Sequence, residues 1–424
     1  MASRMRVGLV AAAVSAMAWG CGGSSGTNIT AGGAGTGGSG TGGSGTGGSG
    51  AGGSGASDAG GGASGTGGAD GGVPDAGLNC KPPTANCSGN AADGCNIDLR
   101  SDNANCGGCG IVCNTQCTKG VCPLFTSDAG APQQVGDFAC LAVDSKHVYW
   151  GTGLASNKGG GVWTVSINGG TPSLLIGQQD RPHGMASDGT HLYYANYGAA
   201  PNTGTVEKIP VGGGTASPIA SGQASPLDVV LDQNNVYWTN SGDGTVWKSD
   251  KNTPNPVKLA NGTGQGHAMY LRVDATYAYF TDRQSGAVKR VPIDGSNTTP
   301  VTVTSAPGAG HIAIDTKSAY VGSNSNKSGA VLSVALNAKQ GSSTQILPNL
   351  GNVQGVETDG TRLWYAVSSN GGNQNSGTIN RATVGGKNAT PLATGQNYPG
   401  CISVDSKSVY WINEGGGQIS KTGR

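Results

Sequence analysis

The sequence contains one unit that recurs seven times, and this repeat limits the folds available to the chain. Each copy has an Asp with an aromatic residue five positions later. The aspartates are Asp144, Asp188, Asp232, Asp274, Asp315, Asp359 and Asp405. The aromatics are Tyr149, Tyr193, Tyr237, Tyr279, Tyr320, Trp364 and Tyr410. Successive aspartates are 44, 44, 42, 41, 44 and 46 residues apart. A fixed period of about 40–45 residues with short apolar runs is typical of one β-propeller blade per repeat. We therefore predict an all-β fold, a seven-bladed β-propeller over residues 123–424.

Each repeat has the internal pattern of four strands. An apolar strand ends at the Asp, a second surrounds the aromatic, a third begins at a Gly such as Gly204, and a fourth follows a turn. The seventh copy reaches Arg424 directly after its third strand. We expect residues 123–126 to supply its outer strand, because an open ring would leave unpaired strand edges.

The N-terminal residues 1–20 have the pattern of a signal peptide, with Arg4 and Arg6 before an apolar run and small residues. Residues 18–21, Ala-Trp-Gly-Cys, resemble a bacterial lipobox, whereas residues 16–18, Ala-Met-Ala, resemble an ordinary signal-peptidase site. The chain has 11 cysteines, so lipidation of Cys21 would leave an even 10. We predict a lipid on Cys21. Residues 21–78, which combine this cysteine with a Gly/Ser/Thr/Ala-rich stretch, should then form a disordered tether.

Residues 79–122 form a predicted cysteine-rich module. Its cysteines are Cys80, Cys87, Cys95, Cys106, Cys109, Cys113, Cys117 and Cys122. A segment this short and this poor in apolar residues needs covalent links to fold. The spacings would also suit a zinc site, but the segment has no His, and the export signal favours disulfides. Eight cysteines allow 105 pairings, so the connectivity stays open.

Two resemblances extend this interpretation. The segments Val236-Tyr-Trp-Thr-Asn240 and Ala278-Tyr-Phe-Thr-Asp282 resemble the YWTD propeller repeats of the low-density-lipoprotein receptor family, although those receptors have six blades. The cysteine-rich run resembles the stigma-specific type of module found in bacterial surface lipoproteins. The first resemblance implies extracellular protein binding rather than catalysis.

A candidate binding site follows from the innermost strands. Side chains alternate along a strand, so residues two and four positions before each Asp should face the central channel. The polar ones at these positions are Asp228, Tyr270, Arg272, His311 and Glu357. Loops at the channel mouth add Arg181, His183, His267 and Tyr398. We predict a binding mouth formed by these residues.

Simpler interpretations exist for each of these features. The repeated aspartates suit turns in which the side chain accepts from nearby backbone N–H groups, and the repeated aromatics suit the core. Arg272 and Glu357 could be an ion pair, and His267 and His311 could be solvated residues at the mouth. No metal and no cofactor are expected.

Cys140 and Cys401 lie outside the module, each four residues before a repeating Asp, in the first and last copies. Closure of the ring would make these copies neighbours, so we predict a disulfide between them. Free thiols, or a bond from Cys140 to Cys122, are the alternatives.

Charge and hydropathy exclude some classes of function. A net charge of +1 with 12% charged residues gives no basic surface for nucleic acid, and no apolar run is long enough to span a membrane. We expect a monomeric outer-membrane or cell-surface lipoprotein, held at the membrane through its lipid alone, that binds a protein or glycan. One alternative is an enzyme similar to streptogramin lyases, seven-bladed propellers that use His and Glu at one mouth. No Glu stands beside His267 or His311 in sequence, so that pattern is not met. A structural envelope scaffold is the other alternative.

Overall fold

The computed structural model describes residues 80–126, 140–153, 159–262, 268–325, 328–337, 341–368 and 375–424. The predicted signal peptide, Cys21, the tether and His267 lie outside these residues. Among the described residues the helical turns are η1 (Ala91–Asp93) and η2 (Glu414–Gly416). No helix in this part of the chain has the length and apolar character needed to cross a membrane.

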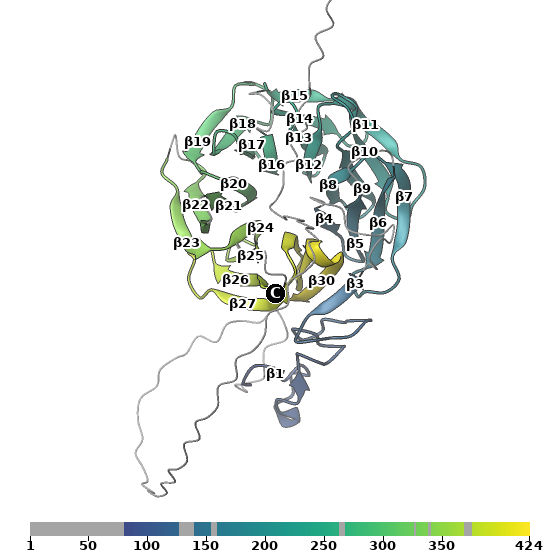
Figure 1. The fold of residues 1–424 in the computed structure, drawn as a ribbon, viewed down its shortest axis with the longest axis vertical. Helices are drawn as coiled ribbons and strands as arrows, with labels where there is room; N and C mark the ends of the chain where they lie inside the picture. The colour runs from purple at the N-terminus through teal and green to yellow at the C-terminus, as the bar shows by residue number, and fades with distance from the viewer. Residues whose placement is uncertain are drawn as a thin grey trace, which may run out of the picture. The chain divides into compact units, whose positions relative to one another are not determined.

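Seven four-stranded antiparallel sheets surround a central axis, so the predicted seven-bladed fold is confirmed (Figure 1). Blade 1 contains β4 (Leu141–Val143), β5 (His147–Thr152), β6 (Gly160–Ser166) and β7 (Ser173–Gln179). Blade 2 contains β8 (Pro182–Ser187), β9 (His191–Asn196), β10 (Gly204–Pro210) and β11 (Ser217–Gln223). Blade 3 contains β12 (Pro226–Leu231), β13 (Asn235–Asn240), β14 (Thr245–Asp250) and β15 (Val257–Ala260).

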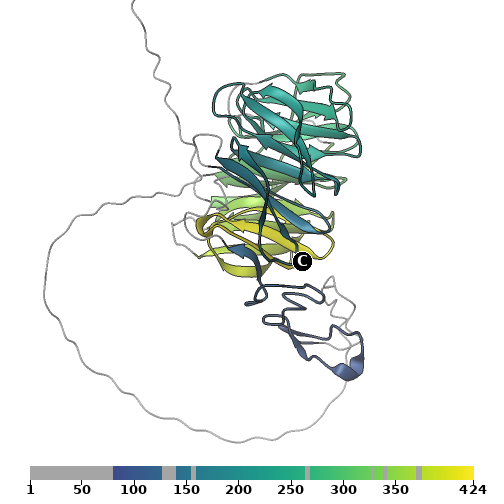
Figure 2. The same ribbon diagram turned by 90° about the vertical axis from the view of Figure 1, so that its right-hand side faces the viewer.

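The next three blades repeat this order. Blade 4 contains β16 (Ala268–Val273), β17 (Tyr277–Asp282), β18 (Ala287–Pro292) and β19 (Val301–Ser305). Blade 5 contains β20 (Ala309–Ile314), β21 (Ser318–Ser325), β22 (Ser328–Ala335) and β23 (Thr344–Leu350). Blade 6 contains β24 (Asn352–Thr358), β25 (Arg362–Ser368), β26 (Gly377–Thr383) and β27 (Thr390–Gln396). Figure 2 shows these sheets from the side, with neighbouring blades packed against one another.

Blade 7 is built from both ends of the folded region. It contains β28 (Pro399–Val404), β29 (Ser408–Asn413), β30 (Gln418–Gly423) and β3 (Cys122–Thr126). Strand β3 pairs antiparallel with β30, placing Phe125 opposite Ile419. The expectation that residues 123–126 supply the outer strand of the last blade is therefore confirmed, and the ring has no missing strand.

The repeated aromatics form the core between blades, as predicted. Tyr149, Tyr237 and Trp364 are each 0% exposed, and the other four are 3% exposed or less. A glycine at the start of a third strand allows the next blade to approach. A Cβ on Gly204 would collide with Pro226 of blade 3, and one on Gly377 would collide with Pro399 of blade 7. Burial of the aromatics and this close approach together hold neighbouring sheets face to face.

A glutamine at the end of the outer strand links several blades to the next. The side-chain oxygen of Gln223 accepts from the Trp238 indole at 2.8 Å and from the Asn240 amide at 3.0 Å. Gln179 of blade 1 and Gln396 of blade 6 make the matching bond to the second strand of the following blade. These bonds satisfy buried amide and indole groups that would otherwise be costly to desolvate.

The cysteine-rich module adds β1 (Thr84–Ala85) and β2 (Ile97–Asp98), which pair with each other. Its disulfides are Cys80–Cys95, Cys87–Cys109, Cys106–Cys117 and Cys113–Cys122. Since Cys122 also begins β3, the last bond links the module directly to blade 7. The Thr422 hydroxyl donates to the Gly120 carbonyl at 2.8 Å, and several of these cysteines share a hydrophobic cluster with Trp150 and Tyr410.

Candidate functional site

A cavity of about 310 Å³ lies on the axis of the propeller. Its lining comes from positions one to four residues before the repeating aspartates, on the innermost strand of each blade. The residues three positions before each Asp, such as Leu271 and Ile312, are buried between blades. The polar lining residues include Asp228, Tyr270, Arg272, His311 and Glu357. The structure thus brings these five predicted site residues together, from blades 3 to 6.

Arg272 is the electrostatic centre of the cavity. Its Nη2 lies 2.5 Å from Oε1 of Glu357, and its Nη1 lies 3.6 Å from Oδ2 of Asp228. Nη1 also donates to the Leu271 carbonyl at 2.8 Å. Burial alone would lower the pKa of Arg272, but the two carboxylates outweigh it, so the pKa is raised. The interpretation of Arg272 and Glu357 as an ion pair is therefore correct, and the pair joins blades 4 and 6 across blade 5.

Asp228 is the more deeply buried carboxylate, at 7% exposed. Its oxygens accept from the backbone N–H of Val229 at 3.0 Å and of Leu271 at 2.8 Å. Burial raises the pKa of Asp228; the Arg272 guanidinium and these two N–H groups oppose that shift, while the Glu357 carboxylate adds to it. Blades 3 and 4 are thus joined by a hydrogen-bonded carboxylate.

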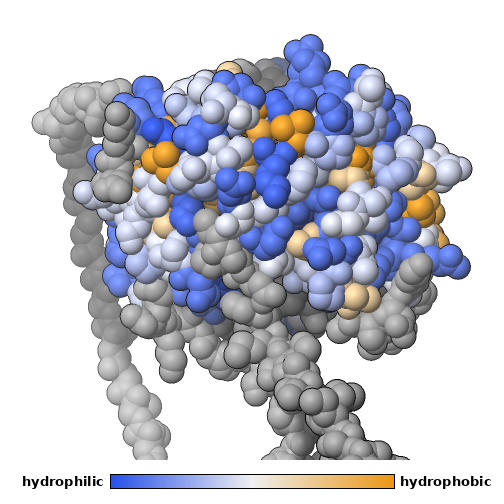
Figure 3. All heavy atoms as spheres, turned by 90° about the horizontal axis from the view of Figure 1, so that it is seen from above, coloured by the Kyte–Doolittle hydropathy of each residue, from blue (hydrophilic) through white to orange (hydrophobic). Residues whose placement is uncertain are grey.

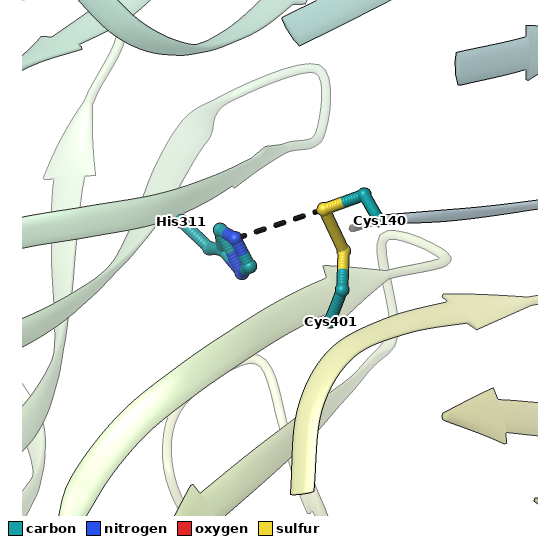
Figure 4. Close-up of side chains that lie close together, drawn as sticks. All are labelled: Cys140, His311 and Cys401. Atoms are coloured by element: carbon teal, nitrogen blue, oxygen red, sulfur yellow. Dashed lines mark hydrogen bonds between the residues drawn. A yellow bond between two sulfur atoms is a disulfide. The ribbon is translucent and has the colours of Figure 1, made fainter. Parts of the chain in front are cut away.

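A disulfide and two rings meet in the lining of the cavity. The structure contains the predicted bond between Cys140 and Cys401, with Cα atoms 5.2 Å apart. Nε2 of His311 points at the Cys140 sulfur from 3.9 Å (Figure 4). The His311 ring also stands edge-on to Tyr270, with centroids 3.8 Å apart. Burial and the nearby Arg272 lower the pKa of His311 to about 3, so the imidazole is neutral at physiological pH.

Cys140, His311 and Cys401 lie close enough together to suggest a metal site, since their donor atoms are within 4.8 Å of one another. The two sulfurs are, however, bonded to each other. A metal requires thiolate sulfur, so this arrangement serves as a covalent link between blades 1 and 7.

The other described mouth residues lie at or just before the start of an innermost strand, and they are not among the residues that line the cavity. The Arg181 guanidinium stacks 4.6 Å from the Tyr197 ring and donates to the Gly198 carbonyl. The His183 ring lies 5.2 Å from the same tyrosine. Tyr398, just before β28, accepts from the Glu414 N–H at 3.1 Å through its carbonyl. His267 is outside the described residues.

The repeated aspartates hold turns, as the simpler interpretation expected. In all seven repeats one carboxylate oxygen accepts from the backbone N–H groups two and three residues later. In five of the repeats the other oxygen accepts from the repeat tyrosine, as in Tyr237 to Asp232 at 2.6 Å. This second bond explains the five-residue spacing, because the turn brings the phenol back over the carboxylate.

In blade 6 a different residue donates the hydrogen bond to the aspartate, and the sequence pattern did not predict it. Its aromatic is Trp364, and Asp359 receives its hydrogen bond from Arg424 instead, at 2.8 Å. The same guanidinium lies 5.0 Å from the centre of the Trp364 ring and donates to the Asp405 carbonyl at 2.9 Å. Arg424 thereby joins blades 6 and 7.

The chain matches no family model and shows no sequence similarity to a curated protein. Among solved structures, virginiamycin B lyase from Staphylococcus aureus is similar with a TM-score of 0.54 and 13% identity, covering 72% of this chain and 98% of that chain. A streptogramin B lyase structure is similar with a TM-score of 0.52 and 13% identity, covering 71% and 96%. BamB from Moraxella catarrhalis has a TM-score of 0.47 and 15% identity over 76% and 92% of the two chains, too weak a likeness to add to this. At these identities the two lyases show the β-propeller fold alone.

Proposed function

We propose that this protein is a cell-envelope lipoprotein whose propeller is a non-catalytic binding module for a protein or glycan partner. The observation that carries the proposal is the axial cavity of about 310 Å³, in which Asp228, Arg272 and Glu357 converge. Recessed cavities of about 300–1,000 Å³ with a few convergent polar groups are the usual form of a binding site. The Cys140–Cys401 bond closes the ring around this cavity and fixes its shape.

An envelope location is supported by the export pattern and by the cysteines. The described region contains five disulfides, and such bonds persist in oxidising compartments. The lipobox-like sequence at Cys21 and the Gly-rich segment after it support a lipid anchor with a tether. The YWTD-like repeats favour an extracellular binding role over catalysis, and the stigma-specific-like module is of a type found in bacterial surface lipoproteins.

The chemistry of the cavity favours binding over the lyase alternative. A general base works best with a pKa near the operating pH, whereas the pKa of His311 is lowered to about 3. The imidazole also faces a disulfide and the Tyr270 ring. Arg272 is held by two carboxylates, an arrangement that positions charge for recognition.

The surface gives less support to a scaffold that buries large hydrophobic patches. The exposed large hydrophobic residues of the described region are Val112, Leu174, Val257 and Val301, from different elements. The face in Figure 3 is mostly hydrophilic, with scattered hydrophobic residues. Large contiguous apolar patches mark extensive protein interfaces, so a smaller, recessed contact fits better.

Site-directed photo-crosslinking tests the proposal. A benzophenone amino acid would replace Ser187, which lines the cavity, or Ser173, an exposed residue of β7, as the matched control. In cells of the native host, we expect a defined adduct from position 187 and none of the same mass from position 173. Equal adducts from both positions, or none from position 187, would contradict the binding of a protein or glycan partner at the cavity.

A further inference from the structure

The axial cavity contains two acidic side chains together with apolar lining residues. Its described lining contains the carboxylates of Asp228 and Glu357 and a single cationic side chain, Arg272, while His311 is neutral. The Arg272 guanidinium lies between these two groups, and burial raises the pKa of Asp228. Glu357, the more exposed of the two, is therefore the carboxylate whose negative charge a cationic ligand can meet.

Glu357 presents the accessible part of that charge. Its Oε1 accepts from Arg272, while Oε2 has no hydrogen-bond donor among the described residues. The side chain is 23% exposed, compared with 10% for Asp228. A ligand entering the cavity would therefore meet a carboxylate oxygen with free acceptor capacity at Glu357 before it meets Asp228.

The cavity lining also contains apolar residues that suit an alkyl chain. They include Val143, Val230 and Leu231. The disulfide, His311 and Tyr270 belong to the same lining and contact one another. A thin apolar chain with one terminal charge matches a lining that combines an accessible carboxylate with apolar side chains.

We propose that the axial cavity binds an alkylammonium group, with Oε2 of Glu357 as its anionic partner and the apolar lining around its methylene chain. This inference rests on the proposed binding function and specifies its ligand chemistry. The group has two sources, the side chain of a lysine presented by a protein partner and a free aliphatic amine.

Calorimetric titration of the full-length protein with n-pentylamine tests this directly. Pentanol and pentanoate have the same chain length without the positive charge, and we expect each to bind at least about ten-fold more weakly. Glu357→Gln should weaken pentylamine binding by about ten-fold or more, because the ammonium loses its charged acceptor. Asp294→Asn, which removes an exposed carboxylate outside the cavity lining, should leave the binding unchanged.

A second variant keeps the inference testable if Glu357→Gln fails to fold. Ser403 lines the cavity two residues before its repeating Asp, the position that Glu357 holds in the neighbouring blade. Ser403→Lys would place an alkylammonium inside the cavity, and we expect it to abolish pentylamine binding and to raise the melting temperature. Unchanged pentylamine affinity in Ser403→Lys, or equal binding of pentanol and pentylamine, would overturn the inference.

Two further ligands distinguish the sources. Tighter binding of Nα-acetyl-lysine amide than of cadaverine would assign the cavity to a lysine of a protein, and the reverse order would assign it to a free diamine. Adducts from position 187 without any pentylamine binding would reject the ammonium ligand and keep the proposed function. Pentylamine binding without adducts would reject the macromolecular partner instead.

Discussion

The bond between Cys140 and Cys401 should account for a large share of the stability of the propeller. It links residues with a sequence separation of 261 and joins the innermost strands of the first and last blades. The chain-entropy relation for a loop of this length gives about 5 kcal/mol at 25 °C. Replacing both cysteines with serine should lower the free energy of unfolding by about this amount. The melting temperature should fall by roughly 10 °C, at about 2 °C per kcal/mol for a domain of this size.

Guanidinium denaturation followed by tryptophan fluorescence measures this change. The wild-type protein, the Cys140→Ser/Cys401→Ser variant and a Cys80→Ser/Cys95→Ser control would be compared in non-reducing buffer. The control bond spans 15 residues within the module, so its loss should cost no more than about 3 kcal/mol. Because the axial bond limits the expansion of the unfolded chain, its removal should also steepen the dependence of the free energy on denaturant.

The strand pairing that closes blade 7 allows the contribution of the disulfide to be separated from that of strand pairing. Strand β3 remains hydrogen-bonded to β30 in the variant, so the ring keeps its second closure. If the double-serine variant unfolds at the wild-type midpoint with the wild-type slope, strand pairing alone closes the ring. The axial bond would then contribute nothing through the entropy of the unfolded chain, contrary to the reasoning.

Three other predictions concern the repeats and the N-terminus. Arg424→Ala should destabilise the propeller by about 1–2 kcal/mol in denaturant unfolding, because Asp359 loses the donor that replaces its tyrosine; an unchanged midpoint would contradict this role. Burial, with the hydrogen bond to Asp315, raises the pKa of Tyr320 to about 12, so its stabilisation is complete below its unfolded pKa of about 10 and is lost as the pH rises from 10 to 12. Between pH 10 and 12 the denaturant midpoint of Tyr320→Phe should therefore fall less than that of the wild type. If the two midpoints fall in parallel, the prediction is wrong. Intact-mass analysis of the native protein should show a mature chain that begins at lipidated Cys21, and an unmodified chain beginning at residue 19 would refute the lipid anchor.

Local features of the chain could be predicted from the sequence because they depend on contacts within one repeat. The spacing of five residues between Asp232 and Tyr237 reflects a single turn and a single hydrogen bond. Alternation along the innermost strand correctly placed Arg272 and Glu357 on the axis, since strand geometry fixes which side chains share a face. The missing fourth strand of the last repeat likewise predicted where the two chain ends would pair.

Contacts across the axis were decided only by the tertiary structure. His311 meets Cys140 over a separation of 171 residues, a contact that the alternation pattern did not predict. Such contacts depend on the radius of the ring and on the depth of each side chain along the axis, and the repeat period encodes neither. The module pairings were open for the same reason, because chain spacing does not determine which sulfurs meet. Arg424 shows the limit most clearly. A tryptophan replaces the repeat tyrosine in blade 6, and only the closed ring brings a donor from the last blade to the second carboxylate oxygen of Asp359.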